Sequence, residues 1–111
     1  MQTLDQFNFH HVLAGTPGTA VVLFTGPHCG ACHSWKALLS GMVAEGTPWT
    51  LYEVDAARDG GLAREFEVFH LPGLFLYHDG HYHAPLHAEP LPERVRSAVA
   101  EALVRPPREA P

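Results

Sequence analysis

The segment AVVLFTGPHCGACHSW (Ala20–Trp35) decides how this chain folds. Its first part belongs to an uninterrupted run of β-branched and apolar residues, which predicts a strand over residues 19–25 that is covered on both faces. A Gly-Pro-His turn follows, and it leads into Cys29 and Cys32, the only cysteines of the chain. Over residues 32–44 apolar side chains recur at helical spacing. The segment therefore predicts a strand, a turn and a helix, with both cysteines where the helix begins.

Three kinds of site use a Cys-x-x-Cys pair: a redox dithiol, a covalently attached c-type haem and a zinc site. Haem would take His33 as its proximal ligand, but Met42 lies on the same predicted helix and could not reach the opposite face. Zinc prefers four ligands, and the cysteines supply two, with His28 or His33 as a third. A redox dithiol needs only the cysteines, and we expect no metal site.

Other histidines gather in one later segment of the chain. His81 and His83 alternate along a predicted strand, with His78 and His87 nearby, so they could bind a transition metal weakly. A solvated hairpin is the simpler interpretation, and it is the one we adopt.

Composition limits the class of protein. The chain has 111 residues, 46% of them hydrophobic and 17% charged, which predicts one globular domain. A formal net charge of −5 argues against a nucleic-acid surface. No apolar run is long enough to span a bilayer. The first residues, MQTLDQFNFHH, lack the basic and apolar regions of a secretory signal, so we expect a cytoplasmic protein.

The remaining elements follow from periodicity, caps and turn residues. They predict a mixed four-stranded sheet with helices on both faces, within a domain spanning residues 1–104. The proline-rich tail, residues 105–111, is expected to be disordered. The predicted elements are a helix at 4–14, strands at 49–56, 74–78 and 81–87, a short helix at 61–66, and a last helix that Pro90 and Pro92 open and whose apolar face runs from Val95 to Leu103.

The position of the cysteines suggests their chemistry. A thiolate, rather than a thiol, attacks disulfides, and the unpaired N–H groups of a helix N-terminus favour the thiolate. Cys29 would therefore be the exposed nucleophile, and Cys32 the buried thiol that resolves the intermediate. Gly30 and Ala31 are small, so they leave the rim open to a protein substrate.

These segments together resemble the thioredoxin family. The resemblance rests on Ala20–Trp35, on YEVDA (Tyr52–Ala56) and on FEVFHLPGLFLYHDG (Phe66–Gly80). It implies a thioredoxin-like three-layer α/β/α sandwich in which the first strand of the family is mostly missing. It also implies a cis-proline at Pro72, preceded by Leu71, that faces the dithiol and binds the backbone of the substrate.

The resemblance further implies a thiol-disulfide oxidoreductase that reduces protein disulfides. Such a protein would be a monomer without a bound cofactor, and it would receive electrons from an NADPH-dependent reductase. The alternative is a thioredoxin-fold binding module that recognises a protein partner without turnover.

The chain also departs from the family pattern. His28 replaces the usual tryptophan and Ala31 the usual proline, while Leu23 and Leu51 occupy the positions of the buried acid and its lysine partner. The proton relay of the family therefore lacks its carboxylate. An imidazole could replace it, and we expect His70 first, because its loop flanks the proline, then His28, and last His33.

Overall fold

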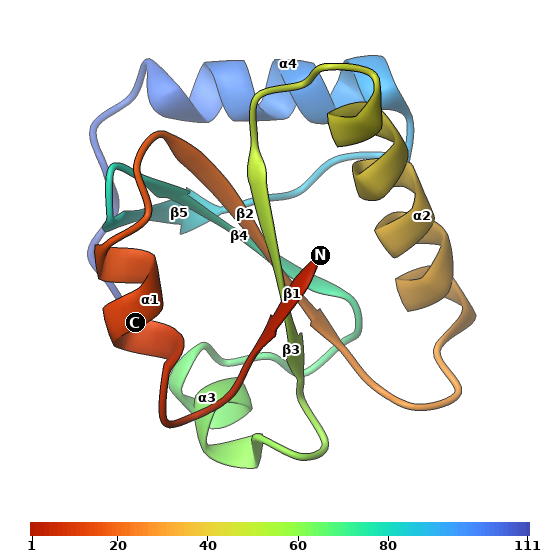
Figure 1. The fold of residues 1–111 in the computed structure, drawn as a ribbon, viewed down its shortest axis with the longest axis vertical. Coiled ribbons are helices and arrows are strands. Elements are labelled where there is room, and N and C mark those ends of the chain that lie inside the picture. The colour runs from red at the N-terminus through yellow and green to blue at the C-terminus, as the bar shows by residue number, and fades with distance from the viewer.

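The computed structural model describes residues 1–111, which form one mixed sheet covered by helices on both faces (Figure 1). The five strands lie in the order β1-β3-β2-β4-β5. Strands β1, β3 and β2 run parallel, whereas β4 is antiparallel to β2 and β5 is antiparallel to β4. The elements are β1 (Gln2–Leu4), α1 (Phe9–Ala14), β2 (Thr19–Thr25), α2 (Gly30–Ala44), β3 (Thr50–Asp55), α3 (Gly60–Glu65), β4 (Gly73–His78), β5 (His81–Pro85) and α4 (Pro92–Leu103).

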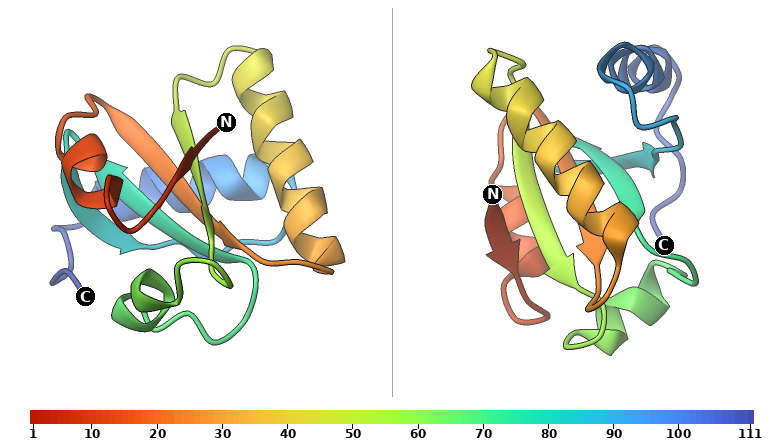
Figure 2. Two further views of the ribbon diagram at one scale, coloured as in Figure 1. Left: turned by 60° about the horizontal axis from the view of Figure 1, so that its bottom comes forward. Right: turned by 90° about the vertical axis from the view of Figure 1, so that its right-hand side faces the viewer.

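The sheet separates two apolar cores, which confirms the three-layer architecture (Figure 2). Strand β2 lies at the centre, and each of its residues after Thr19 is buried. Because successive side chains point to opposite faces, Val21 and Leu23 pack towards α2 and α4, whereas Val22 and Phe24 pack towards α1 and α3. The uninterrupted apolar run of β2 is thus explained by burial on both faces.

The start of the chain corrects two predictions. Residues Gln2–Leu4 form a strand that pairs in parallel with β3, so the sheet has five strands and not four. The helix predicted to begin at residue 4 begins instead at Phe9. The first reason is local, because the Asp5 carboxylate accepts the N–H groups of Phe7 (2.8 Å) and Asn8 (3.0 Å) and forms a turn there. The second is tertiary, because residues Gln2–Leu4 pair with β3.

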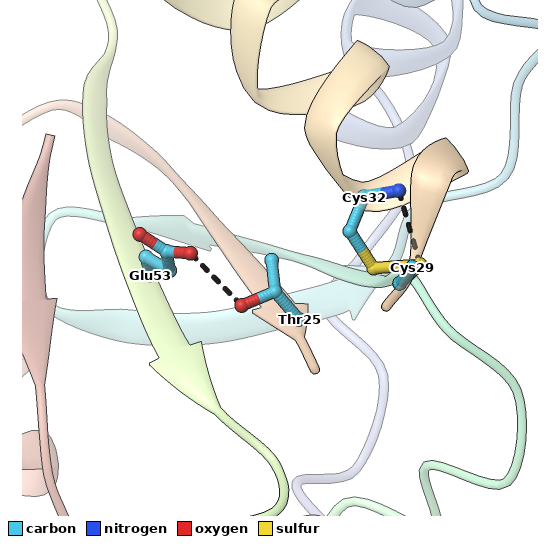
Figure 3. The surroundings of a disulfide bond; sticks show 4 residues. All are labelled: Thr25, Cys29, Cys32 and Glu53. Atoms are coloured by element: carbon cyan, nitrogen blue, oxygen red, sulfur yellow. Dashed lines mark hydrogen bonds between the residues drawn. A yellow bond between two sulfur atoms is a disulfide. The ribbon is translucent and has the colours of Figure 1, made fainter. Parts of the chain in front are cut away.

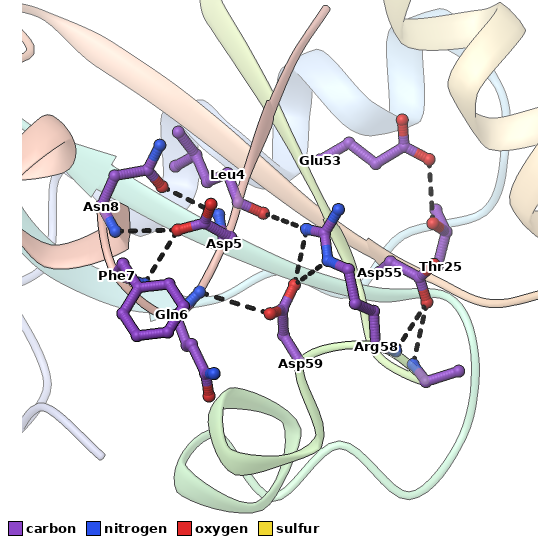
Figure 4. Close-up of polar contacts among 11 residues, drawn as sticks. Leu4, Asp5, Gln6, Phe7, Asn8, Thr25, Glu53, Asp55, Arg58 and Asp59 are labelled. Carbon is purple, nitrogen blue, oxygen red and sulfur yellow. Dashed lines mark hydrogen bonds and ion pairs between the residues drawn. The ribbon is translucent and has the colours of Figure 1, made fainter.

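A buried carboxylate fastens β1 to the loop after β3 (Figure 4). Asp59 is 3% exposed and accepts hydrogen bonds from the Arg58 guanidinium at 2.6 and 2.8 Å. The same guanidinium donates to the carbonyl of Leu4 at 3.0 Å, and the Gln6 N–H donates to Asp59 at 3.4 Å. This network compensates for the shortness of β1.

The β4–β5 hairpin turns at Asp79 and Gly80, as predicted, and packs against the end of α1. Both residues have positive φ, 48° and 83° respectively. A Cβ on Gly80 would collide with the backbone carbonyl of Ala14. The Asp79 carboxylate also accepts the N–H of Gly18 at 2.7 Å, so the turn is held against the α1–β2 loop.

The tail after α4 contains no helix or strand. Its Arg108 N–H donates to the carbonyl of His83 at 2.7 Å. The disorder of residues 105–111 and the domain boundary at residue 104 stay predictions. None of the helices is long and apolar enough to cross a membrane.

Candidate active site

Cys29 and Cys32 form a disulfide where β2 passes into α2 (Figure 3). Cys29 is the N-cap of α2, with extended backbone angles, and its sulfur accepts the N–H of Cys32 at 3.1 Å. The two Cα atoms are 5.2 Å apart. Cys32 is 3% exposed, whereas Cys29 is half-buried. The sulfur of Cys29 thus lies at the positive end of a 15-residue helix and nearer to solvent than its partner.

The residues around Cys29 leave it open to solvent. Gly30 and Ala31 are exposed, as expected for the rim of a protein-binding site. His28 is exposed as well, and its φ of 60° places a non-glycine residue in the left-handed region directly before Cys29. Such a conformation costs about 1–3 kcal/mol, which the surrounding loop must offset.

The loop before β4 approaches the cysteine loop. The Leu71–Pro72 peptide bond is cis, as the resemblance implied. A Cβ on Gly26 would lie 2.5 Å from Leu71 Cδ1, so the Leu71 side chain packs directly on the loop that leads to Cys29. Pro72 and Trp35 both line an adjacent groove of about 820 Å³. The roles of Leu71 and Pro72 in substrate binding stay predictions.

A carboxylate lies in the same pocket as the disulfide, although none was expected there. Glu53 of β3 accepts a hydrogen bond from the Thr25 hydroxyl at 2.8 Å and pairs with the Lys36 ammonium at 2.8 Å. Its side chain is only 16% exposed. These three residues line an open pocket of about 420 Å³ together with Cys29 and Cys32. In Figure 3 Thr25 lies between Glu53 and the disulfide.

Two opposing effects act on the pKa of Glu53. Burial raises it, whereas hydrogen bonds from Lys36 and Thr25 and the positive charge of Lys36 lower it. The net result is a pKa below the usual value, so the carboxylate is ionised at neutral pH. Glu53 and Lys36 therefore form an ion pair beside the disulfide.

The structure separates the histidines that were proposed as relays. His28 and His33 line the pocket that contains the disulfide. His70 lines the neighbouring groove with Pro72 and is not among the residues of the disulfide pocket. Its role as a base stays a prediction.

Sequence reasoning missed Glu53, Thr25 and Lys36. One signal was present: Glu53 follows Leu51, a core residue, on the same face of the strand. Leu23, the position of the missing acid, lies beside Glu53 in the β2–β3 register. The carboxylate thus comes from the neighbouring strand, and only the pairing of β2 with β3 reveals it.

The histidine-rich segment offers no metal centre. His83 is buried, and its Nε2 lies 2.5 Å from the carbonyl oxygen of Ala102, while His78 pairs with Asp79. No group of three or more His, Cys, Asp or Glu side chains is arranged to hold a metal ion.

Comparisons with known proteins show which family the chain matches and which solved structures share its fold. A family model described as Thioredoxin matches residues 1–101. No curated protein sequence matches the chain. The zinc-bound form of human ERp44 superposes with a TM-score of 0.76 and 14% identity, covering 91% of this chain and 31% of that one. Oxidised mitochondrial thioredoxin 3 of Saccharomyces cerevisiae superposes with a TM-score of 0.75 and 18% identity, covering 91% and 94%. This chain thus spans about a third of ERp44, and at these identities the likeness concerns the fold.

Proposed function

Since the chain belongs to the thioredoxin family, we propose that it reduces protein disulfides through the Cys29–Cys32 dithiol. The observation that carries this proposal is the difference between the two sulfurs. Cys29 caps a helix and borders solvent, whereas Cys32 is buried within bonding distance of it. This difference supports Cys29 as the thiol that meets a substrate and Cys32 as the thiol that releases it.

The reaction would proceed in two exchanges. The Cys29 thiolate attacks a substrate disulfide, forms a mixed disulfide and expels the first substrate sulfur as a thiolate. Cys32 then attacks the Cys29 sulfur, which closes the disulfide of the structure and releases the second substrate thiolate. The substrate gains two electrons, and the Cys29–Cys32 pair loses them.

The same family membership supports proposals for the substrate and for the reductant. The Leu71–Pro72 segment would pair with an extended substrate backbone, as in strand addition to a sheet edge. A reductase that uses NADPH would return electrons to the disulfide, and the protein would act as a cytoplasmic monomer. The protein itself would need no bound cofactor.

Insulin reduction by dithiothreitol tests the proposal. The wild type should accelerate precipitation of the insulin B chain, and Cys29→Ser should abolish that acceleration. Cys32→Ser should accumulate mixed disulfides instead of turning over. A wild type as inactive as Cys29→Ser would favour the alternative, a binding module without turnover.

The redox potential of the Cys29–Cys32 couple decides the direction of electron flow. A value of about −270 mV is typical of a reductant, and a value of about −120 mV is typical of an oxidant. Equilibration with defined glutathione mixtures measures it, and we expect the more negative value.

A further inference from the structure

The pocket behind the disulfide contains an ion pair that the two exchange steps above do not use. Lys36 Nζ lies 2.8 Å from Glu53 Oε1, and the Thr25 hydroxyl donates to Glu53 Oε2 at 2.8 Å. The three residues come from α2, β3 and β2 and line one pocket with both cysteines. Lys36 is also the only lysine in the chain.

Cys32 is the sulfur for which this charge matters. Burial at 3% exposure disfavours its thiolate, because a charged group loses hydration inside a protein. Unlike Cys29, it does not occupy the capping position at the start of α2. The apolar residues Leu23 and Leu51 on the adjoining strands offer it no charge.

Lys36 is placed to compensate for that burial. It follows Cys32 by four residues on α2, so the two side chains lie on the same side of the helix, one turn apart. Its side chain is 45% exposed at one end of the pocket. A positive charge near a thiol favours the thiolate, and Glu53 partly neutralises this charge while fixing where it lies.

Other titratable groups also face this region. His28 and His33 line the pocket, and the amino group of Met1 acts on Glu53 from β1. Asp55 lies beside Thr25 in the β2–β3 register, but its carboxylate accepts the N–H groups of Ala57 and Arg58.

We propose that Lys36, restrained by Glu53, raises the fraction of Cys32 present as thiolate and thereby sets the rate at which substrate is released. This inference rests on the proposed reductase function. Lys36 and Glu53 are positioning residues, because neither forms a bond to the reacting sulfurs. The Cys32 proton leaves to solvent through the open pocket. The Cys32 thiolate then bonds to the Cys29 sulfur, and the substrate departs with the electron pair of the broken bond.

Stopped-flow reaction with 5,5′-dithiobis(2-nitrobenzoate) tests the proposal. Reduced protein in excess releases one thionitrobenzoate when Cys29 attacks and a second, in a first-order phase, when Cys32 resolves the mixed disulfide. The rate of the second phase is measured from pH 5 to pH 10 for each variant. A wild type without this second phase would contradict the proposed function itself, and not only the part assigned to Lys36.

Opposite effects of the two halves of the ion pair are expected. Lys36→Met should slow the second phase at pH 7 by roughly 3- to 10-fold and move its midpoint to higher pH, because the charge is half-exposed and partly screened. Lys36→Arg keeps the charge and should stay near the wild type. Glu53→Gln removes the negative charge that partly neutralises Lys36, so it should speed the second phase. The rate of the double variant should lie between the rates of the single variants.

Two controls separate this effect from general charge and from the imidazoles. Arg96→Met removes one exposed positive charge from α4 and should leave the second phase unchanged. Lys36→Met should slow the second phase by the same factor in a His28→Ala background as in the wild type. An unchanged pH profile in Lys36→Met would overturn the proposal. Slowing in Glu53→Gln without slowing in Lys36→Met would overturn it too, and would identify the carboxylate as a base.

Discussion

At the scale of single residues, two cysteines three positions apart have different environments. Cys29 is the N-cap of α2, and its sulfur accepts the main-chain N–H of Cys32. Cys32 lies one turn further and faces the apolar core beside Trp35 and Leu39. The difference follows from their positions on α2. Cys29 is the N-cap at the exposed start of the helix, whereas Cys32 lies on the buried face of its first turn.

Alkylation should report this difference. In the reduced protein at pH 7, iodoacetamide should modify Cys29 at least about tenfold faster than Cys32, since only Cys29 combines access with the helix N-terminus. Peptide mass spectrometry of timed samples gives both rates. In urea the two rates should converge. Equal rates in the folded protein would show that the assigned roles of nucleophile and resolving thiol are wrong.

At the scale of elements, the turns fix how helices meet the sheet. The hairpin between β4 and β5 contacts α1 through Gly80, while Asp79 binds the backbone of Gly18. Both glycines have positive φ, but only at Gly80 would an added Cβ meet another segment. A side chain at Gly18 would have open space around it.

Alanine substitutions at Gly18 and Gly80 separate the cost of a left-handed backbone from the cost of a steric clash. Gly18→Ala should lower the free energy of unfolding by about 1–2 kcal/mol, the cost of a left-handed backbone for a residue with a Cβ. Gly80→Ala should cost more, because its Cβ also meets the carbonyl of Ala14. Urea unfolding of the oxidised proteins measures both. Equal losses would mean that α1 and the hairpin shift apart freely.

At the scale of the whole molecule, the sheet assembles the pocket from distant parts of the chain. Glu53 on β3 reaches Thr25 on β2, 28 residues away in sequence, because the strands are neighbours. Helix α2 crosses this face and adds Lys36. The resulting ion pair makes the stability of the protein depend on pH.

The direction of that dependence follows from the pKa of Glu53. The folded-state pKa lies below the usual value of 4.5, so pairing stabilises the fold above that pH. The stabilisation is lost as the pH falls through the lower folded-state pKa. Glu53→Gln should therefore be less stable than the wild type at pH 6, by roughly 1 kcal/mol, and the gap should narrow towards pH 3.

Urea unfolding at pH 6, 4 and 3 measures the difference in unfolding free energy between wild type and Glu53→Gln. The other carboxylates are the same in both proteins, so their contribution cancels in this difference. Glu101→Gln, an exposed position on α4, provides the control and should show no such gap. A gap for Glu53→Gln that stays constant with pH would exclude a lowered pKa.

The strand–turn–helix unit, the hairpin and the place of both cysteines could be predicted from the sequence alone. Each of these depends on local physics: periodicity of apolar residues, turn residues and the unpaired groups of a helix end. The resemblance to the thioredoxin family added the cis bond before Pro72. These features could be predicted because each is encoded in one contiguous segment.

The strand at Gln2–Leu4 and the pocket that contains the disulfide depend on contacts between distant parts of the chain. Three residues carry too little periodicity to predict a strand, and β1 exists because β3 and the Arg58–Asp59 pair hold it. Glu53 and Lys36 were similarly hidden, since each resembles an ordinary surface residue within its own segment. Their meeting depends on strand register and on how α2 crosses the sheet, and both arise from long-range packing that no single segment encodes.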